Sequence, residues 1–283
     1  MNTIKEYLRL MRFDKPVGFW LLLWPTYWGL WIAVGHLPHL HYLIIFTLGV
    51  IIMRSAGCVI NDILDRKFDP HVTRTQNRPL ATQTLSLKQA ISLFLILSIF
   101  ALVLALELNF LALEMALLGM IITVCYPLLK RITSLPQAGM SLAFSWGIIL
   151  AFAAEINHLS VIAWLLFSAN ALWIIVYDTE YAMTDRLDDL KIGVKSTAIL
   201  FGSYVQLILA ILQIATLIIL ASVGYILAFN RFFYICLVIG GVCFIYHQYL
   251  IFDYHPERCL KAFRHNHWFG FWVFLGILIQ YPF

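Results

Sequence analysis

Two groups of polar residues have the types and the spacing to bind divalent cations. One lies in the segment NDILDRKFD, which begins at Asn61, and the other in DTEYAMTDRLDD, which begins at Asp178. Each contains three residues spaced four positions apart: Asn61, Asp65 and Asp69 in the first, and Tyr181, Asp185 and Asp189 in the second. If each segment is helical, this spacing places the three side chains on one stripe. Because Mg²⁺ usually takes one or two carboxylates and completes its coordination with water and substrate phosphate oxygens, the two stripes predict a magnesium site for a phosphate-bearing substrate.

Basic residues surround both stripes. They are Lys67, Arg74 and Arg78 near the first, Arg186, Lys191 and Lys195 near the second, and Lys130 and Arg131 in YPLLKR. A metal ion together with Lys or Arg is the arrangement that neutralises a departing diphosphate. For any single one of these residues, however, a basic loop can also reflect only the orientation of a membrane protein. Asp62, Asp178 and Asp188 could similarly be helix caps or solvated side chains.

The composition indicates what kind of element positions these groups. Of the 283 residues, 62% are apolar and only 12% are charged, whereas a soluble domain carries about twice that charged fraction. Long apolar runs such as 91–106 and 207–225 match the roughly 20 residues that a transmembrane helix needs. The alternating pattern of a membrane β-barrel is absent. The sequence therefore predicts an all-α, polytopic membrane protein, and the net charge of +4 gives no indication of nucleic-acid binding.

Hydropathy marks nine apolar runs, each about long enough to cross the bilayer. They cover residues 17–35, 41–60, 89–107, 110–129, 137–155, 159–177, 203–224, 232–251 and 267–283. The run at 137–155 is the weakest, because it contains Gln137, Ser141 and Ser145. If it were not a span, every later segment would change sides.

The positive charges test this topology. With nine spans and a cytoplasmic N-terminus, 18 of the 19 Lys and Arg residues fall on the cytoplasmic side, and only Arg231 falls opposite. The positive-inside rule therefore predicts that the N-terminus lies in the cytoplasm and that both polar stripes lie at the cytoplasmic membrane face. The N-terminal segment has neither a signal-peptide cleavage site nor an Arg- and Ser-rich transit extension, which favours the bacterial inner membrane.

Both acidic segments also resemble known motifs. The segment NDILDRKFDPHVTRTQNRPL, from Asn61 to Leu80, resembles the first motif of the UbiA superfamily of membrane prenyltransferases, and YDTEYAMTDRLDDLKIGVKS, from Tyr177 to Ser196, resembles the second. YPLLKRITSLPQ and RFDKPVGFWLLLWPTYW also fit, so the resemblance covers most of the chain. It implies a single domain, residues 1–283, with about nine transmembrane helices around a central cavity. The loops at about 61–88 and 178–202 would cover its cytoplasmic mouth.

The resemblance also implies a reaction. The runs RTQNRPL, YAMTDRLDD and GVKSTAILFG are most similar to members of the superfamily that transfer a polyprenyl group from polyprenyl diphosphate to the ring carbon ortho to the hydroxyl of 4-hydroxybenzoate, in ubiquinone biosynthesis. The long prenyl tail would remain in membrane lipid. The resemblance assigns Mg²⁺ binding to Asn61, Asp65, Asp69, Asp185 and Asp189. It assigns catalysis to the four aspartates of this set. Further contacts to the diphosphate are expected from Lys67, Arg74, Lys130 and Arg131.

The site of the aromatic acid is less determined by the sequence. Its carboxylate requires a cation, and Arg54 and Arg12 lie near the same membrane face. Asp178 could orient the phenol or accept a proton, and Tyr181 lies one turn before the second acidic motif. Arg54 could instead only anchor its span at the membrane interface.

Other classes of protein share some of these features. Carboxylates gathered between spans also bind the coupling ions of secondary transporters, although such sites usually lie near the bilayer midplane. Other members of the superfamily use the same metal motifs with different acceptors, such as haem or quinone precursors. A scaffolding protein that keeps the fold without activity is a third hypothesis, and the intact acidic motifs argue against it.

Overall fold

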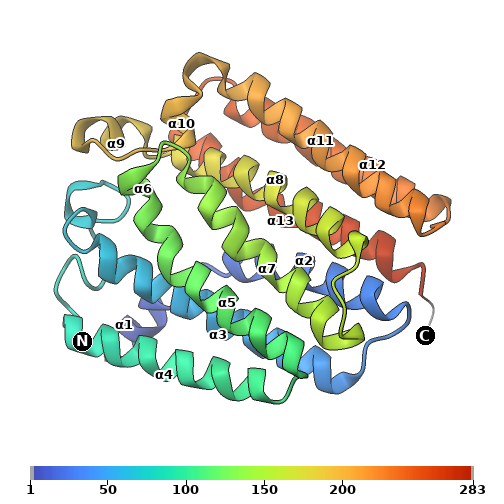
Figure 1. Ribbon diagram of the computed structural model, residues 1–283. Coiled ribbons are helices and arrows are strands. Elements are labelled where there is room, and N and C mark those ends of the chain that lie inside the picture. Colours follow the sequence, from blue (N-terminus) through green and yellow to red (C-terminus); the bar gives the residue numbers. More distant parts are fainter. Residues whose placement is uncertain (1–2, 282–283) are drawn as a thin grey trace.

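The computed structural model describes residues 3–281, apart from the side chains of Lys130, Arg131 and Ile192. All regular structure in these residues is helical (Figure 1). Eight helices are long and apolar enough to cross a membrane. They are α2 (Val17–Val34), α3 (Leu40–Asp65), α4 (Leu87–Leu106), α5 (Phe110–Cys125), α7 (Pro136–Ile156), α8 (Val161–Met183), α11 (Val205–Ile226) and α12 (Arg231–Ile251). This confirms the predicted all-α, multi-pass membrane architecture and includes the weakest of the predicted spans.

The last long helix, α13 (Pro256–Leu278), differs from its prediction. The apolar run predicted a span at 267–283, but the helix begins 11 residues earlier, so most of the segment between the last two apolar runs, 252–266, is helical. Hydropathy marks only the apolar part of a helix, and the first half of α13 carries Arg258, Lys261 and Arg264. Because this half is polar, α13 is not among the eight candidate spans. The number of nine spans therefore stays a prediction.

Local sequence signals explain where several of these helices begin. The Ser86 hydroxyl accepts a hydrogen bond from the backbone N–H of Gln89, and the Gln89 side chain accepts one from the N–H of Ser86. This capping box starts α4. Asn109 and Ser160 cap α5 and α8 in the same way, each through a side-chain oxygen.

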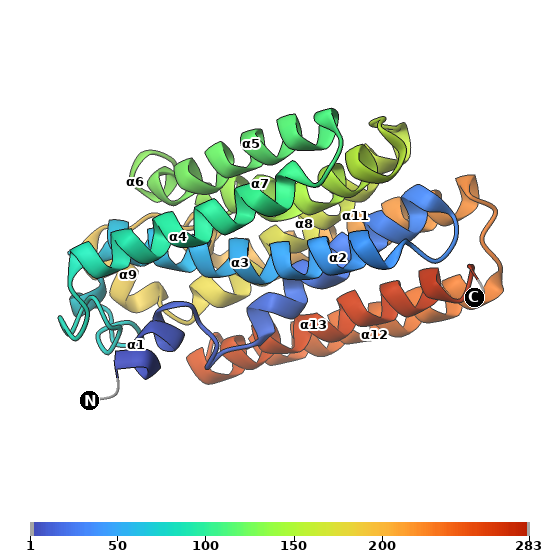
Figure 2. The same ribbon diagram turned by 90° about the horizontal axis from the view of Figure 1, so that it is seen from below.

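The short elements gather at one end of the bundle. They are α1 (Thr3–Leu10), η1 (Asp69–His71), η2 (Tyr126–Leu128), α6 (Leu129–Ile132), α9 (Arg186–Ile192), α10 (Thr197–Leu200) and η3 (Gly202–Tyr204). In both views α1, α6, α9 and the connection from α3 to α4 lie at the end where the N-terminus is, and the C-terminus lies at the other end (Figures 1 and 2). We call this end the cap end. The segments that follow α3 and α8 therefore meet there.

The centre of the bundle is formed by α2, α7, α8 and α13, which pack against one another. Trp28 on α2 stacks on Trp173 of α8 and donates a hydrogen bond to the backbone oxygen of Gly270 on α13. A Cβ atom at Gly29 would lie 3.1 Å from the backbone of Ile148, so the close approach of α2 to α7 requires a glycine. By contrast, α4 lies at the edge and exposes a row of apolar side chains that suits a lipid-facing helix.

Candidate active site

Both acidic groups line one cavity of about 970 Å³ at the cap end of the bundle. Its wall contains all the residues of the two predicted stripes and Asp62: Asn61, Asp62, Asp65, Asp69, Tyr181, Asp185 and Asp189. The wall also has an apolar part, which includes Leu21, Met140 and Phe144. The structure therefore brings together two segments that are far apart in the sequence.

Neither stripe lies on one continuous helix. In the first segment α3 ends at Asp65, and Asp69 begins the separate short helix η1. In the second segment α8 ends at Met183, and Asp185 is the residue before α9. Each span does continue past its apolar run, as the spacing requires, but a turn then redirects the last acidic residue of the group.

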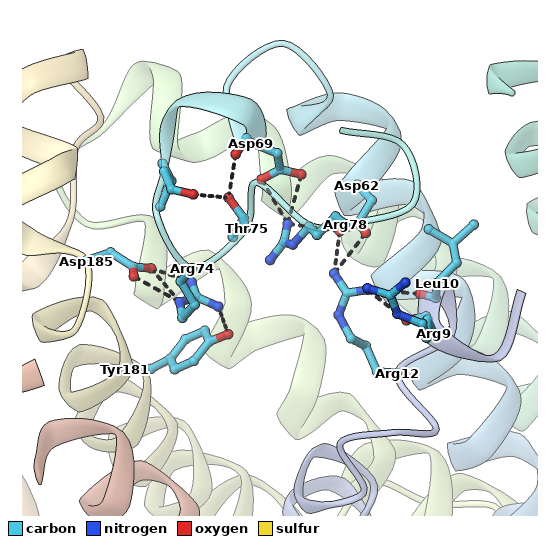
Figure 3. A network of polar contacts seen from close by, with 11 residues as sticks. Arg9, Leu10, Arg12, Asp62, Asp69, Arg74, Thr75, Arg78, Tyr181 and Asp185 are labelled. Carbon is cyan, nitrogen blue, oxygen red and sulfur yellow. Dashed lines mark hydrogen bonds and ion pairs between the residues drawn. The ribbon is translucent and has the colours of Figure 1, made fainter. Parts of the chain in front are cut away.

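Asp62 is held between two arginines. It is fully buried, and its two oxygens lie 2.7 and 2.8 Å from Nη2 of Arg12 (Figure 3). Nη1 of Arg78 lies 3.0 Å from Asp62 and 3.0 Å from Asp69. Asp62 is thus neither a helix cap nor solvated. Because its guanidinium is bound to Asp62, Arg12 is better placed to support the cavity wall than to contact the aromatic acid.

Charge and burial act together on this network. Burial raises the pKa of Asp69 above its ordinary range, and the positive charge of Arg78 only partly offsets the shift. Burial opposes the charge of Arg78, but Asp62 and Asp69 outweigh this effect and raise the pKa of Arg78. Arg78 therefore stays charged and compensates two carboxylates that would otherwise repel each other.

Arg74 makes the corresponding contact with the second acidic group. Its Nε lies 2.9 Å from both oxygens of Asp185, and Nη2 contacts the same carboxylate. Nη1 donates to the Tyr181 hydroxyl, and the guanidinium lies over the Tyr181 ring, 4.1 Å from its centroid (Figure 3). Next to Arg74, the backbone N–H of Thr73 donates to Asp188 at 3.1 Å, which lowers the pKa of Asp188. The connection after α3 is thereby fastened to the segment after α8.

The connection is also fastened to the N-terminal helix. Arg9 on α1 pairs with Glu6 at 2.9 Å and donates to the backbone oxygen of Asn77 at 2.9 Å. Thr84 donates to Glu6 at 3.4 Å. Helix α1 thus holds the segment that carries Arg74 and Arg78.

The donor set suits Mg²⁺ that is shared with a phosphate group. Within residues 3–281, no three His, Cys, Asp or Glu side chains lie close enough together to hold an ion by themselves. Mg²⁺ rarely uses such an all-protein cage, and it is commonly held by one or two carboxylates and substrate phosphate oxygens. The cavity provides carboxylates for this from both segments, with guanidinium groups beside them for the remaining phosphate oxygens.

Only some of the other predicted residues line the cavity. Arg54 and Asp178 line the cavity. Lys67 is exposed and does not belong to the cavity wall, because the chain turns outward after α3. The side chains of Lys130 and Arg131 lie outside the part of the chain that the structure describes.

Arg54 lies beside an apolar residue of the cavity wall, Phe144. Its Nε is buried, and no hydrogen-bond partner for this atom is found among the described residues. The guanidinium lies over the ring of Phe144, 5.5 Å from its centroid. A Cβ atom at Gly18 would lie 2.5 Å from the guanidinium, so a glycine in α2 makes room for it. A buried donor on a residue that lines a cavity is suited to bind an anionic ligand.

Four basic residues of the wall were not among the predicted substrate contacts: Lys15, Arg78, Lys195 and Arg264. Arg78 follows Arg74 by four positions and flanks the first stripe, so the sequence contained a signal for it. Lys15 lies before α2, and only the folding of the chain brings it to the cavity.

The fold and this site define a class of membrane-embedded transferases. The model of the UbiA prenyltransferase family matches residues 22–275, and the chain belongs to that family. A relative from Coxiella burnetii (strain CbuK_Q154) is named 4-hydroxybenzoate octaprenyltransferase. It is 51% identical over 280 residues, which cover 99% of this chain and 98% of the relative.

Solved structures share the fold. The apo structure of a UbiA homolog from Aeropyrum pernix K1 matches with a TM-score of 0.81 at 22% identity and covers 92% of this chain and 97% of its own. A UbiA homolog from Archaeoglobus fulgidus, solved bound to GPP and Mg²⁺, matches with a TM-score of 0.71 at 21% identity and covers 96% of this chain and 99% of its own.

The buried position of Asp62 leads to a prediction about stability. Replacing Asp62 with Asn would leave the charge of Arg12 uncompensated and Arg78 paired with Asp69 alone, and we expect the free energy of unfolding to fall by about 3 kcal/mol. Thermal unfolding of the purified protein, together with limited proteolysis of residues 66–86, measures the effect. The matched control is Asp253→Asn, because the Asp253–Arg258 pair is exposed and should contribute little. Equal losses in the two variants would contradict the supporting role of Asp62.

Proposed function

We propose that this chain transfers a polyprenyl group from polyprenyl diphosphate to the ring carbon ortho to the hydroxyl of 4-hydroxybenzoate, a membrane step of ubiquinone biosynthesis. The observation that carries the proposal is the meeting of two acidic segments and two arginines in one cavity, in a chain 51% identical to a relative with that name. We take the whole chain, residues 1–283, to be one prenyltransferase domain. A transporter is less well supported, because the acids lie at the cap end of the bundle (Figure 1) rather than midway along the spans.

The polar part of the cavity is proposed to hold the diphosphate and Mg²⁺. The candidate ligands are Asn61, Asp65, Asp69, Asp185 and Asp189. Bound there, Mg²⁺ supplies positive charge that stabilises the diphosphate as the allylic C–O bond breaks. Arg74 and Arg78 neutralise Asp185 and Asp69 in this structure. We expect diphosphate oxygens to compete for these guanidiniums, which then orient the leaving group.

The apolar part of the cavity is proposed to hold the aromatic acid. Arg54 would bind its carboxylate, because a guanidinium matches a carboxylate in charge and shape. Asp178 and Tyr181 also line the cavity and would orient the phenol, and Asp178 is our candidate to accept the ring proton. The rings of Tyr126, Phe144 and Tyr177 could stabilise the allylic cation through their π faces and exclude water.

We place the protein in the bacterial inner membrane with the cavity facing the cytoplasm. Support comes from the distribution of charge, because the Lys and Arg residues concentrate in segments that a cytoplasmic N-terminus would place inside. A site at the membrane surface lets the diphosphate stay at the cytoplasmic face while the prenyl tail stays in lipid.

The activity test uses purified protein, Mg²⁺, geranyl diphosphate and a panel of aromatic acids, with products identified by mass spectrometry. We expect prenylated 4-hydroxybenzoate that disappears with EDTA. We also expect Asp65→Asn to lower kcat at least about 100-fold, since it removes a proposed ligand of the Mg²⁺ that stabilises the leaving diphosphate. The exposed Asp253→Asn substitution should leave the rate unchanged. Product from a different aromatic acid would show that this acid, and not 4-hydroxybenzoate, is the acceptor. If the folded protein forms no product with any of the acids, the proposed function is contradicted.

The proposed role of Arg54 is tested by substrate dependence. Arg54→Gln removes a charge-assisted contact, so we expect the KM for 4-hydroxybenzoate to rise by about tenfold to 100-fold. The KM for geranyl diphosphate should change by no more than about twofold, because that substrate does not need the contact. Arg66→Gln, on an exposed arginine after α3, is the control. An unchanged KM for the acid in Arg54→Gln would assign Arg54 to packing instead.

A further inference from the structure

A second polar cluster lies outside the cavity wall, between helices α8, α12 and α13. Glu180 on α8 and Asn266 on α13 are both fully buried. Nδ2 of Asn266 donates to Oε2 of Glu180 at 2.7 Å. Nε1 of Trp173 donates to Oδ1 of Asn266 at 2.8 Å. The Asn266 amide is therefore held by two residues of α8 on the same helix face.

The cluster extends to α12 through two histidines. Nδ1 of His247 lies 4.0 Å from Oε1 of Glu180, and no hydrogen-bond partner for either atom is found among the described residues. Nε2 of His247 is within hydrogen-bond distance, 3.0 Å, of Nδ1 of His265 on α13. Polar side chains thus link three long helices whose other contacts are mainly apolar.

Buried polar groups between membrane helices destabilise unless they are paired. Their pairing also depends on register, because a hydrogen bond is lost when one helix slides or rotates against the other. The bond between Glu180 and Asn266 therefore selects one register of α13 on α8 from among several that apolar packing alone would tolerate.

The register of α13 on α8 determines which side chains of α13 line the cavity. Phe263 precedes Asn266 by three positions and lines the cavity, and Tyr181 directly follows Glu180. The rings of Phe263 and Tyr181 are in contact, with centroids 4.5 Å apart. Tyr181 in turn contacts Arg74, through its hydroxyl and its ring. Asn266 is thus connected through Phe263 and Tyr181 to an arginine proposed to bind the diphosphate.

We propose that Asn266 and Glu180 are positioning residues for the diphosphate site. Their hydrogen bond fixes α13 so that Phe263 supports Tyr181, and Tyr181 holds Arg74 where the diphosphate is bound. Neither residue touches substrate. This inference rests on the proposed prenyltransferase function, and it adds residues that the acidic motifs do not contain.

The test compares steady-state kinetics and thermal stability of variants with geranyl diphosphate and 4-hydroxybenzoate. Asn266→Ala should raise the KM for geranyl diphosphate about five- to tenfold, because it removes the hydrogen bonds with Glu180 and Trp173 that fix α13, with kcat within about twofold of the wild type. Glu180→Gln should keep the wild-type KM, because the amide oxygen can still accept from Asn266. In a Phe263→Leu background, Asn266→Ala should raise this KM no further, because the connecting side chain has already been removed.

A second interhelical hydrogen bond provides the control. Nε2 of Gln248 on α12 donates to Oε1 of Gln213 on α11 at 2.9 Å, and neither residue lines the cavity. Gln213→Leu should lower the thermal unfolding temperature without changing the KM. If Gln213→Leu and Asn266→Ala change the KM equally, or if Asn266→Ala acts equally with and without Phe263, the inference is overturned.

The experiment distinguishes failure of the proposed function from failure of the positioning role, and it provides for a variant that does not accumulate. If Asn266→Ala does not accumulate in the membrane, Asn266→Ser, whose donor lies one bond nearer the backbone, takes its place with the same expected rise in KM. If the wild type itself forms no prenylated product, the proposed function fails. If the wild type is active and the Asn266 variants keep its KM, only the positioning role fails.

Discussion

Charge compensation at the cap end is the interaction on which the rest of this structure depends. Several carboxylates share one partly apolar cavity, and like charges in such a place repel strongly. Arg12 and Arg78 compensate Asp62, and Arg74 compensates Asp185. Because all three arginines come from segments outside the long helices, the cap segments must fold over the cavity for the acids to be tolerated there. Folding of the cap segments and assembly of the site therefore depend on the same ion pairs.

The helical bundle brings the two acidic segments together. Helices α3 and α8 both continue past their apolar runs and end at the same end of the bundle (Figure 2). Helix α2 packs against both α3 and α8, so the bundle holds these two helices together. Residues of α13 complete the wall of the cavity, including Phe263 and Arg264. A transferase that must bind a charged diphosphate beside a very apolar tail needs this combination of a polar mouth and an apolar interior.

The sequence alone predicted the helical class and the meeting of the acidic segments, because hydropathy and charge bias can be recognised within short stretches of sequence. It did not predict the ion pairs, since Arg12 and Asp62 lie 50 positions apart and Arg74 and Asp185 lie 111 positions apart. Lys67 shows that closeness in the sequence does not place a side chain in the cavity wall. It lies two residues from Asp65 in the sequence, yet the turn after α3 exposes it. The start of α13 was missed because a polar half-helix has no hydropathy signal.

The central claim is that the diphosphate and Mg²⁺ occupy the cavity where arginines and aspartates now pair. A structure of the full-length protein with Mg²⁺ and a non-cleavable prenyl thiodiphosphate tests it most directly. The account predicts ion density between the diphosphate and carboxylates of both acidic segments, with Arg74 and Arg78 turned toward phosphate oxygens. A diphosphate bound elsewhere, with the pairs of Arg74 with Asp185 and of Arg78 with Asp69 unchanged, would contradict it.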